Sequence, residues 1–241
     1  IGGLTGDGRS DVGLGNAGEQ NAVMINNGGS PESWARIPLG PVSTDDTTCV
    51  AIGDLNGDNR PDVVVGNYEQ QNVALMNNGS SPELWARIPL GPAVDDKTMS
   101  VALGDINNDG RLDVVVGNYE QADVVLLNNG GSPETWSRAA FNASAQNTRS
   151  VAVADMNGDG RRDIVIGTEN CGDRVFFNNG GSPDTWTEFS YVYGGGNWTY
   201  SIAVGDLNAD GRPDVVMGAY GQNATPNSIL LNNGGLPSTW T

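Results

Sequence analysis

The sequence predicts an all-β fold built from a repeated four-stranded unit, and three observations support this. The chain has 241 residues, of which 35 are glycine and only 7% are aromatic, a composition that suits short strands and tight turns. An acidic segment recurs about every 51 residues, with first aspartates at Asp54, Asp105, Asp155 and Asp206. A second segment, NNGGSPESW or a close variant, recurs once per repeat and ends at Trp34, Trp85, Trp136, Trp186 or Trp240. Four strands in a repeat of about 50 residues are typical of a β-propeller blade.

The third repeat illustrates the expected order of strands. Residues Ser100–Gly104 alternate and form the first strand, before the acidic loop. Residues Asp113–Gly117 are almost continuously apolar, as in a strand that is covered on both faces. A third strand is expected over Asp123–Asn128, and a glycine- and proline-rich turn leads to a fourth that starts at Trp136. A solenoid, the alternative, usually has shorter repeats with fewer strands.

The repeats occupy essentially the whole chain, which predicts a single domain over residues 1–241 of about five blades. The blades are expected at 1–47, 48–98, 99–148, 149–199 and 200–241. Ile1 enters at the end of a first strand, and Thr241 stops one residue into a fourth. The propeller is therefore expected to be incomplete at its termini. A longer parent chain, a partner that supplies the missing strands, and a ring of six or seven blades all stay open. One tryptophan per blade at one position predicts packing between blades.

Charge and composition narrow the classes of partner. The formal net charge is −17, with 29 acidic residues against 12 basic ones, so a nucleic-acid partner is not expected. No apolar run approaches the roughly 18 residues of a membrane span. Metal cations are the natural counterpart of so many carboxylates. Cys49 and Cys171 lie at non-equivalent repeat positions, which argues against a shared disulfide, although their pairing stays open.

The acidic loops predict calcium sites. In the third loop, Asp105, Asn107, Asp109 and Asp113 occupy positions 1, 3, 5 and 9, and the carbonyl of Arg111 at position 7 can add an oxygen ligand. This spacing is that of the first part of an EF-hand loop, and hard oxygen ligands favour calcium over zinc or copper. The chain has no histidine. A hairpin turn, the alternative, needs one Asp-Gly and not several acidic residues at fixed spacing in four copies.

The loops are not equal, so four firm calcium sites and a fifth doubtful one are expected. The first loop has Gly3 where the others have aspartate, and Thr5 where they have asparagine. The predicted ligands of the firm sites are Asp54, Asn56, Asp58, Arg60, Asp62, Asp105, Asn107, Asp109, Arg111, Asp113, Asp155, Asn157, Asp159, Arg161, Asp163, Asp206, Asn208, Asp210, Arg212 and Asp214. Those of the weaker site are Thr5, Asp7, Arg9 and Asp11.

The sequence resembles the FG-GAP/VCBS repeat family, which includes the integrin α-subunit head. The resemblance rests on DLNGDNRPDVVVGN (Asp54–Asn67), DINNDGRLDVVVGN (Asp105–Asn118) and DMNGDGRRDIVIG (Asp155–Gly167). The Phe-Gly and Gly-Ala-Pro signatures of integrin repeats are missing, and fungal lectins on a similar propeller look closer. The resemblance implies calcium in the loop between the first and second strands. It also implies ligands on the opposite face or between blades, and it does not by itself imply an enzyme.

The loops between the second and third strands, on the face opposite the acidic loops, are the candidate ligand site. An aromatic ring beside amide and carboxylate groups suits a sugar, although the same residues can simply cap turns. The candidates are Asn67, Tyr68, Glu69, Gln70, Asn118, Tyr119, Glu120, Gln121, Tyr220, Gln222 and Trp198. Asn142, Asn197 and Asn223 fit the N-glycosylation pattern, which matters only in a secreted eukaryotic protein.

These features predict an extracellular, secreted, calcium-stabilised binding module that is carbohydrate-binding (lectin-like) or adhesive. Its expected partner is a carbohydrate or glycoprotein on the face opposite the calcium loops, bound through repeated sites. A structural building block of an extracellular filament or sheath, formed by homo-oligomerisation, is the alternative. An enzyme acting on polysaccharide is disfavoured, because the chain has no histidine for general-base chemistry and no nucleophile motif.

Overall fold

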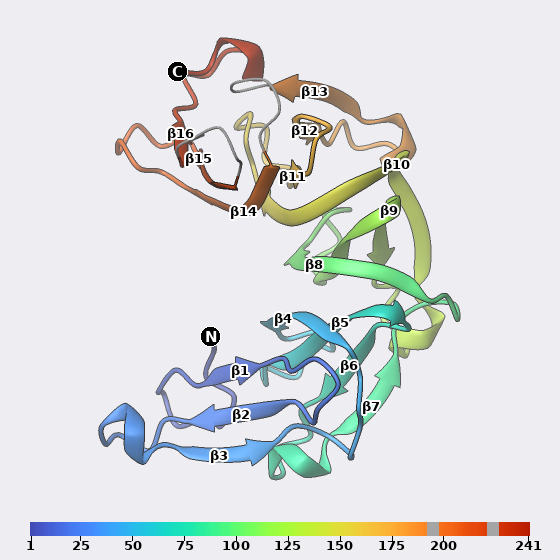
Figure 1. The fold of residues 1–241 in the computed structure, drawn as a ribbon, viewed down its shortest axis with the longest axis vertical. Helices are drawn as coiled ribbons and strands as arrows, with labels where there is room; N and C mark the ends of the chain where they lie inside the picture. The colour runs from blue at the N-terminus through green and yellow to red at the C-terminus, as the bar shows by residue number, and fades with distance from the viewer. Residues whose placement is uncertain (192–197, 221–226) are drawn as a thin grey trace.

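The computed structural model describes residues 1–191, 198–220 and 227–241, and it confirms an all-β, blade-built architecture (Figure 1). The strands of the first two blades are β1 (Val12–Leu14), β2 (Ala22–Ile25), β3 (Ala35–Pro38), β4 (Thr47–Gly53), β5 (Asp62–Gln70), β6 (Val73–Met76) and β7 (Ala86–Pro89). Those of the last three are β8 (Asp96–Gly104), β9 (Asp113–Leu127), β10 (Ser137–Ala154), β11 (Asp163–Thr168), β12 (Asp173–Phe177), β13 (Thr187–Tyr191), β14 (Trp198–Gly205), β15 (Asp214–Tyr220) and β16 (Ser228–Leu230).

Each blade is an antiparallel meander, and its first hairpin closes at the acidic loop. In the second blade Gly53 pairs with Asp62, so the loop between β4 and β5 begins and ends at one rung of the ladder. In the third blade β9 supplies both the second and the third strand. The long strand β10 then supplies the fourth strand of the third blade and the first strand of the fourth. The blade is thus the repeating unit of pairing, as the sequence indicates.

A short 3₁₀ helix precedes the fourth strand, which the sequence pattern did not predict. These helices are η1 (Pro31–Ser33), η2 (Pro82–Leu84), η3 (Pro133–Thr135), η4 (Pro183–Thr185) and η5 (Pro237–Thr239). In the third blade the Trp136 N–H donates to the Pro133 carbonyl oxygen (3.2 Å), and the strand begins one residue later, at Ser137. Proline fixes φ at the first helical position, which explains why the turn takes this form.

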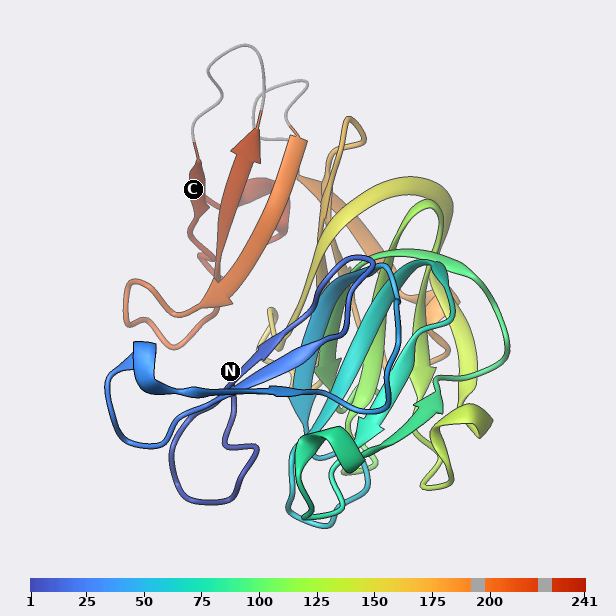
Figure 2. The same cartoon turned by 60° about the horizontal axis from the view of Figure 1, so that its bottom comes forward.

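Among the residues that the structure describes, the hydrophobic core is divided into four clusters, each shared by two neighbouring blades. The cluster between the second and third blades contains Val64 and Ala74 from one side and Val116, Leu126 and Trp136 from the other. Equivalent clusters contain Trp85, Trp186 and Trp240. These tryptophans are 8% exposed or less. The predicted packing of tryptophan between blades is therefore confirmed for four of the five repeats, and Figure 2 shows the blades lying face against face.

The described blades form an open arc. The first blade has the three strands β1–β2–β3, and the last has β14–β15–β16. Leu231 and Thr241 exchange two backbone hydrogen bonds, which mark the start of a fourth strand in the last blade. In the part of the chain that the structure describes, no strand of the first blade pairs with a strand of the last, and the two blades stand apart in Figure 1. The incomplete propeller expected from the sequence is confirmed.

Three residues singled out in the sequence have a clear structural setting. Cys49 and Cys171 are both free thiols. Asn142 is buried, and its Nδ2 donates to Asp123 Oδ2 (2.9 Å), so the folded chain does not present this amide for glycosylation. Asn197 and Asn223 lie outside the described residues.

Within the described ranges, no helix is long and apolar enough to cross a membrane.

Candidate functional site: the acidic loops and the opposite face

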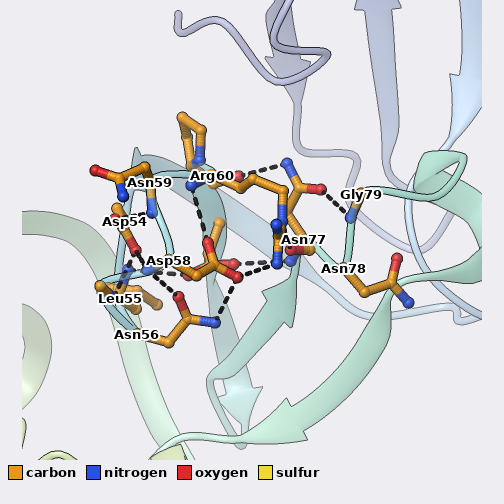
Figure 3. A network of polar contacts seen from close by, with 12 residues as sticks. Asp54, Leu55, Asn56, Asp58, Asn59, Arg60, Asn77, Asn78 and Gly79 are labelled. Atoms are coloured by element: carbon orange, nitrogen blue, oxygen red, sulfur yellow. Dashed lines mark hydrogen bonds and ion pairs between the residues drawn. The ribbon is translucent and has the colours of Figure 1, made fainter.

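The second acidic loop is folded around the carboxylate of Asp54 (Figure 3). Asp54 Oδ1 accepts the N–H groups of Gly57 (2.7 Å) and Asp58 (3.2 Å), and Oδ2 accepts that of Asn59 (2.7 Å). Asn59 has φ 64°, a left-handed conformation that asparagine tolerates better than most residues. The first aspartate therefore closes the loop, and Asp105, Asp155 and Asp206 do the same in the later blades.

The last aspartate of each loop is buried beneath it. Asp62 Oδ2 accepts the Leu55 N–H (2.9 Å), and Oδ1 accepts the Asn77 N–H (2.7 Å). Burial raises the pKa of Asp62 to about 6, the amide hydrogen bonds oppose this rise, and the negative charges of Asp58 and Asp54 add to it. Burial likewise raises the pKa values of the equivalent Asp113 and Asp163 to about 6.

The middle aspartate is paired with an arginine, which the sequence analysis considered only as a carbonyl ligand. Arg60 Nη2 contacts Asp58 Oδ2, and Arg60 Nε donates to the Asn77 carbonyl oxygen (3.0 Å). The arginine thus ties the acidic loop to the turn before the fourth strand. The signal was present in the sequence, since all five loops have arginine at position 7. The same two contacts recur at Arg9, Arg111, Arg161 and Arg212.

The first loop lacks the carboxylate around which the others fold. Gly3 stands at its first position, so the donors that remain are Thr5, Asp7 and Asp11 beside the Arg9 carbonyl. Asp11 keeps its structural contacts, because Oδ2 accepts the Leu4 N–H (2.8 Å). The first loop therefore keeps this part of the hydrogen-bonded framework of the other loops, although it offers fewer oxygen ligands.

The donor chemistry of the four complete loops fits a calcium ion. Each loop offers three carboxylates, an amide oxygen and a backbone carbonyl, which are hard oxygen ligands. Within the described residues, no three Asp, Glu, Cys or His side chains lie together as a metal centre. The carboxylates instead accept hydrogen bonds from loop amides, and the middle one pairs with arginine. The calcium sites thus stay a prediction, with a donor set that is chemically suitable.

Neighbouring blades are linked at this end by an asparagine that the sequence analysis did not single out. Asn128 Nδ2 donates to the Leu55 carbonyl oxygen in the acidic loop of the preceding blade (2.7 Å). The Asn128 N–H donates to Asp113 Oδ1 of its own loop (2.7 Å). The same inter-blade hydrogen bond joins Asn77 to Leu4, Asn178 to Ile106 and Asn232 to Met156. Each acidic loop is thereby connected to the next through one asparagine.

Hollows of small-molecule size lie between blades on the acidic-loop face. One of about 420 Å³ between the first and second blades is lined by Ile25, Ile37 and Arg60. Another of about 360 Å³ between the third and fourth is lined by the equivalent Leu127, Ala139 and Arg161. Ligand sites are typically about 300–1,000 Å³. The repeat thus generates repeated concave surfaces on this face.

On the opposite face, several predicted ligand residues form hydrogen bonds within their own blades. Asn67 is buried, its Oδ1 accepts the Thr47 hydroxyl (3.0 Å), and its Nδ2 donates to the Gln71 carbonyl oxygen (2.9 Å). Asn118 is buried in the same way. Gln70 and Gln121 each accept a backbone N–H through Oε1 (2.8 and 2.7 Å). Glu69 has φ 53° at the turn. These contacts fix the shape of the loops.

The remaining predicted ligand residues are mostly aromatic or acidic. Tyr68 and Tyr119 are partly exposed, and Glu120 Oε2 accepts from Lys97 Nζ (3.0 Å). Trp198 and Tyr220 come together, with ring centroids 6.1 Å apart. Gln222 lies outside the described residues. The structure therefore brings together the aromatic candidates of the last blade. Of the other two aromatic candidates, Tyr68 lies in the second blade and Tyr119 in the third.

Comparison with family models identifies the repeat. The model of the FG-GAP-like repeat matches residues 4–65, 54–116, 105–166 and 155–217. The chain belongs to the FG-GAP-like repeat family. Each match starts in one acidic loop and ends in the second strand of the next blade. FG-GAP-like repeats are typical of extracellular proteins and of β-propellers that act as non-enzymatic binding or adhesive modules.

Solved structures are similar to this FG-GAP-like protein at low sequence identity. One is the Photorhabdus luminescens Tc holotoxin pore, with TM-score 0.50 and 15% identity over 94% of this chain and 11% of that chain. Another is BBS1N in complex with ARL6DN, soaked with lead, with TM-score 0.49 and 14% identity over 73% of this chain and 51% of that chain. The chain thus spans about half of BBS1N and a small part of the toxin. No curated protein matches the sequence significantly.

Proposed function

We propose that this FG-GAP-like protein is an extracellular, calcium-stabilised, carbohydrate-binding module of lectin-like or adhesive type. The observation that carries the proposal is the four-fold repetition of a complete oxygen-donor loop at one end of the packed blades. The partly exposed aromatic side chains on the opposite face support a sugar ligand, because a ring can face the C–H surface of a sugar while polar neighbours bind hydroxyl groups.

Calcium is proposed to act as a structural ion in the loops that start at Asp54, Asp105, Asp155 and Asp206. The bound cation would offset the repulsion among the three carboxylates of each loop. The chain's own residues prepare this role: the first aspartate shapes the loop, and the last holds the inter-blade asparagine. Each site would therefore stabilise one blade and its contact with the preceding one.

Thermal unfolding with and without calcium tests the structural part of the proposal. Adding millimolar calcium to chelator-treated protein should raise the melting temperature, because an ion that binds only the folded state stabilises it. Asp105→Ala should reduce this gain, whereas Asp7→Ala in the incomplete first loop should change it little. A melting temperature that does not respond to calcium would refute calcium stabilisation.

A glycan array, probed with and without calcium, tests the carbohydrate part. Binding of a defined set of glycans that weakens in chelator is the expected result. Failure to bind any glycan, with assembly at rising concentration in light scattering, would instead favour the structural building block.

A further inference from the structure

The last blade carries an exposed aromatic cluster on the face opposite the acidic loops. Tyr200 is 42% exposed and Tyr220 is 62% exposed, yet their rings touch, with centroids 5.7 Å apart at 70°. Trp198 completes the cluster, at 6.4 Å from Tyr200 and 6.1 Å from Tyr220. Contiguous exposed aromatic surface of this kind usually marks an interaction site.

The cluster is held by backbone and side-chain contacts. Trp198 and Tyr220 are directly opposite each other in the β14–β15 ladder. The Trp198 indole Nε1 donates to Asn170 Oδ1 of the preceding blade, and Trp198 also forms a β-bridge with Glu169. The tryptophan ring is therefore fixed in place across the junction of the fourth and fifth blades, which lowers the entropy cost of binding a ligand.

The aromatic surface continues toward the third blade through an arginine. The Arg149 guanidinium lies over the ring of Tyr200 (5.0 Å from Cζ to the centroid) and over that of Tyr119 (4.7 Å). Its Nε donates to Glu169 Oε2 (2.8 Å), and this ion pair offsets the charge of the guanidinium and fixes its orientation. Tyr119, Arg149, Tyr200, Tyr220 and Trp198 thus form one row, called here the aromatic row, that crosses three blades.

The row arises where the repeats diverge. The residue after the buried threonine of the first strand is Thr48, Met99, Arg149 or Tyr200 in successive blades. The equivalent residue at the end of the second strand is Tyr68, Tyr119, Glu169 or Tyr220. Only the last blade has an aromatic residue at both positions. The aromatic row is therefore one asymmetric feature of the chain, in contrast to the repeated sites expected from the sequence.

We propose that the aromatic row is a single binding site for an extended chain of a neutral glycan, which rests on the proposed carbohydrate function. The exposed rings of Tyr200 and Tyr220, with Trp198 beside them, offer several aromatic contacts to successive sugar units, whereas a single ring would match one monosaccharide. The ligand is neutral because the cations beside the row, Arg149 and Lys97, are already paired with Glu169 and Glu120. The net charge of −17 also disfavours an acidic polysaccharide.

Isothermal titration with neutral hexasaccharides of β-1,4-linked glucan, mannan and xylan tests the site, with the three monosaccharides for comparison. One hexasaccharide should bind with a stoichiometry of one per chain and more tightly than its monosaccharide. Tyr220→Ala should weaken this binding roughly tenfold or more, as the loss of an anchoring aromatic residue does. Tyr220→Phe, which keeps the ring, should retain it.

Tyr68→Ala is the matched control, because Tyr68 occupies the same repeat position in the second blade and lies outside the aromatic row. It should leave the affinity unchanged, and circular dichroism should show that all variants are folded. Equal loss in Tyr68→Ala and Tyr220→Ala, or a stoichiometry above one, would overturn the single site and leave carbohydrate binding intact. Absence of binding by every hexasaccharide would also overturn it, and the glycan array then decides the proposed function separately.

Discussion

Substitution of Gly117 by alanine tests the packing between blades most directly. A Cβ at this position would lie 2.6 Å from Val151 Cγ1 and 2.7 Å from Thr148 Cγ2, both on the first strand of the next blade. These distances are well inside van der Waals contact, so one blade must move or a side chain must leave its rotamer. Overpacking of this kind costs about 1–3 kcal/mol. We therefore expect a loss of about 2 kcal/mol in the free energy of unfolding.

Gly218 supplies the matched control, since it holds the equivalent position in the last blade. A Cβ there would lie 3.5 Å from Ser201 Cβ, an ordinary contact. Gly218→Ala should be neutral or stabilise by about 0.4–1 kcal/mol, because alanine restricts the unfolded chain.

Urea unfolding followed by tryptophan fluorescence measures both variants against the parent protein. In a melting experiment, about 2 kcal/mol corresponds to a decrease of about 4–8 °C for a chain of this size. Equal stability of Gly117→Ala and Gly218→Ala would refute the view that close approach of blades is what requires glycine at this position.

Three further predictions concern the acidic-loop face and the thiols. Asn128→Ala removes the side-chain donor to the buried Leu55 carbonyl oxygen and the partly buried Leu112 carbonyl oxygen, and it should cost about 1–3 kcal/mol in urea unfolding. Asn129→Ala, at an exposed turn, should cost less, and equal losses would contradict the inter-blade link. In chelator, stability should fall as pH rises from about 4 to 6, because Asp62 and its equivalents bind protons more tightly in the folded state; stability that rises across this interval would argue against it. Alkylation should modify exposed Cys171 quickly and Cys49 slowly, since burial raises the pKa of the Cys49 thiol to about 11. Mass spectrometry of the products measures the order, and faster modification of Cys49 would contradict this prediction.

Much of the architecture follows from local sequence. Asp54 and Asp62 lie eight positions apart and close one hairpin, so the position of each acidic loop between two strands could be read from its spacing. Val63–Val65 are fully buried, as a continuous apolar run predicts. The role of Trp136 between blades was also predictable, because one tryptophan at the same position of each repeat indicates packing against a neighbouring unit.

Other features depend on contacts between residues far apart in the chain. Asn128 and Leu55 are 73 residues apart, and nothing in either local segment indicates that the amide reaches the carbonyl of the preceding loop. The side-chain role of Arg60 was hidden in the same way, because Asn77 comes close only when the blade has folded.

The sequence by itself determined the repeat, the order of strands and the oxygen-donor chemistry of the acidic loops, because these depend on residues near one another in the chain. Only the tertiary structure decided which aromatic residues meet. Tyr119, Arg149 and Tyr200 belong to three different blades, and they form one surface because the blades stack with their equivalent strands side by side. A repeat specifies each blade locally, whereas a site that crosses blades exists only once they have packed together.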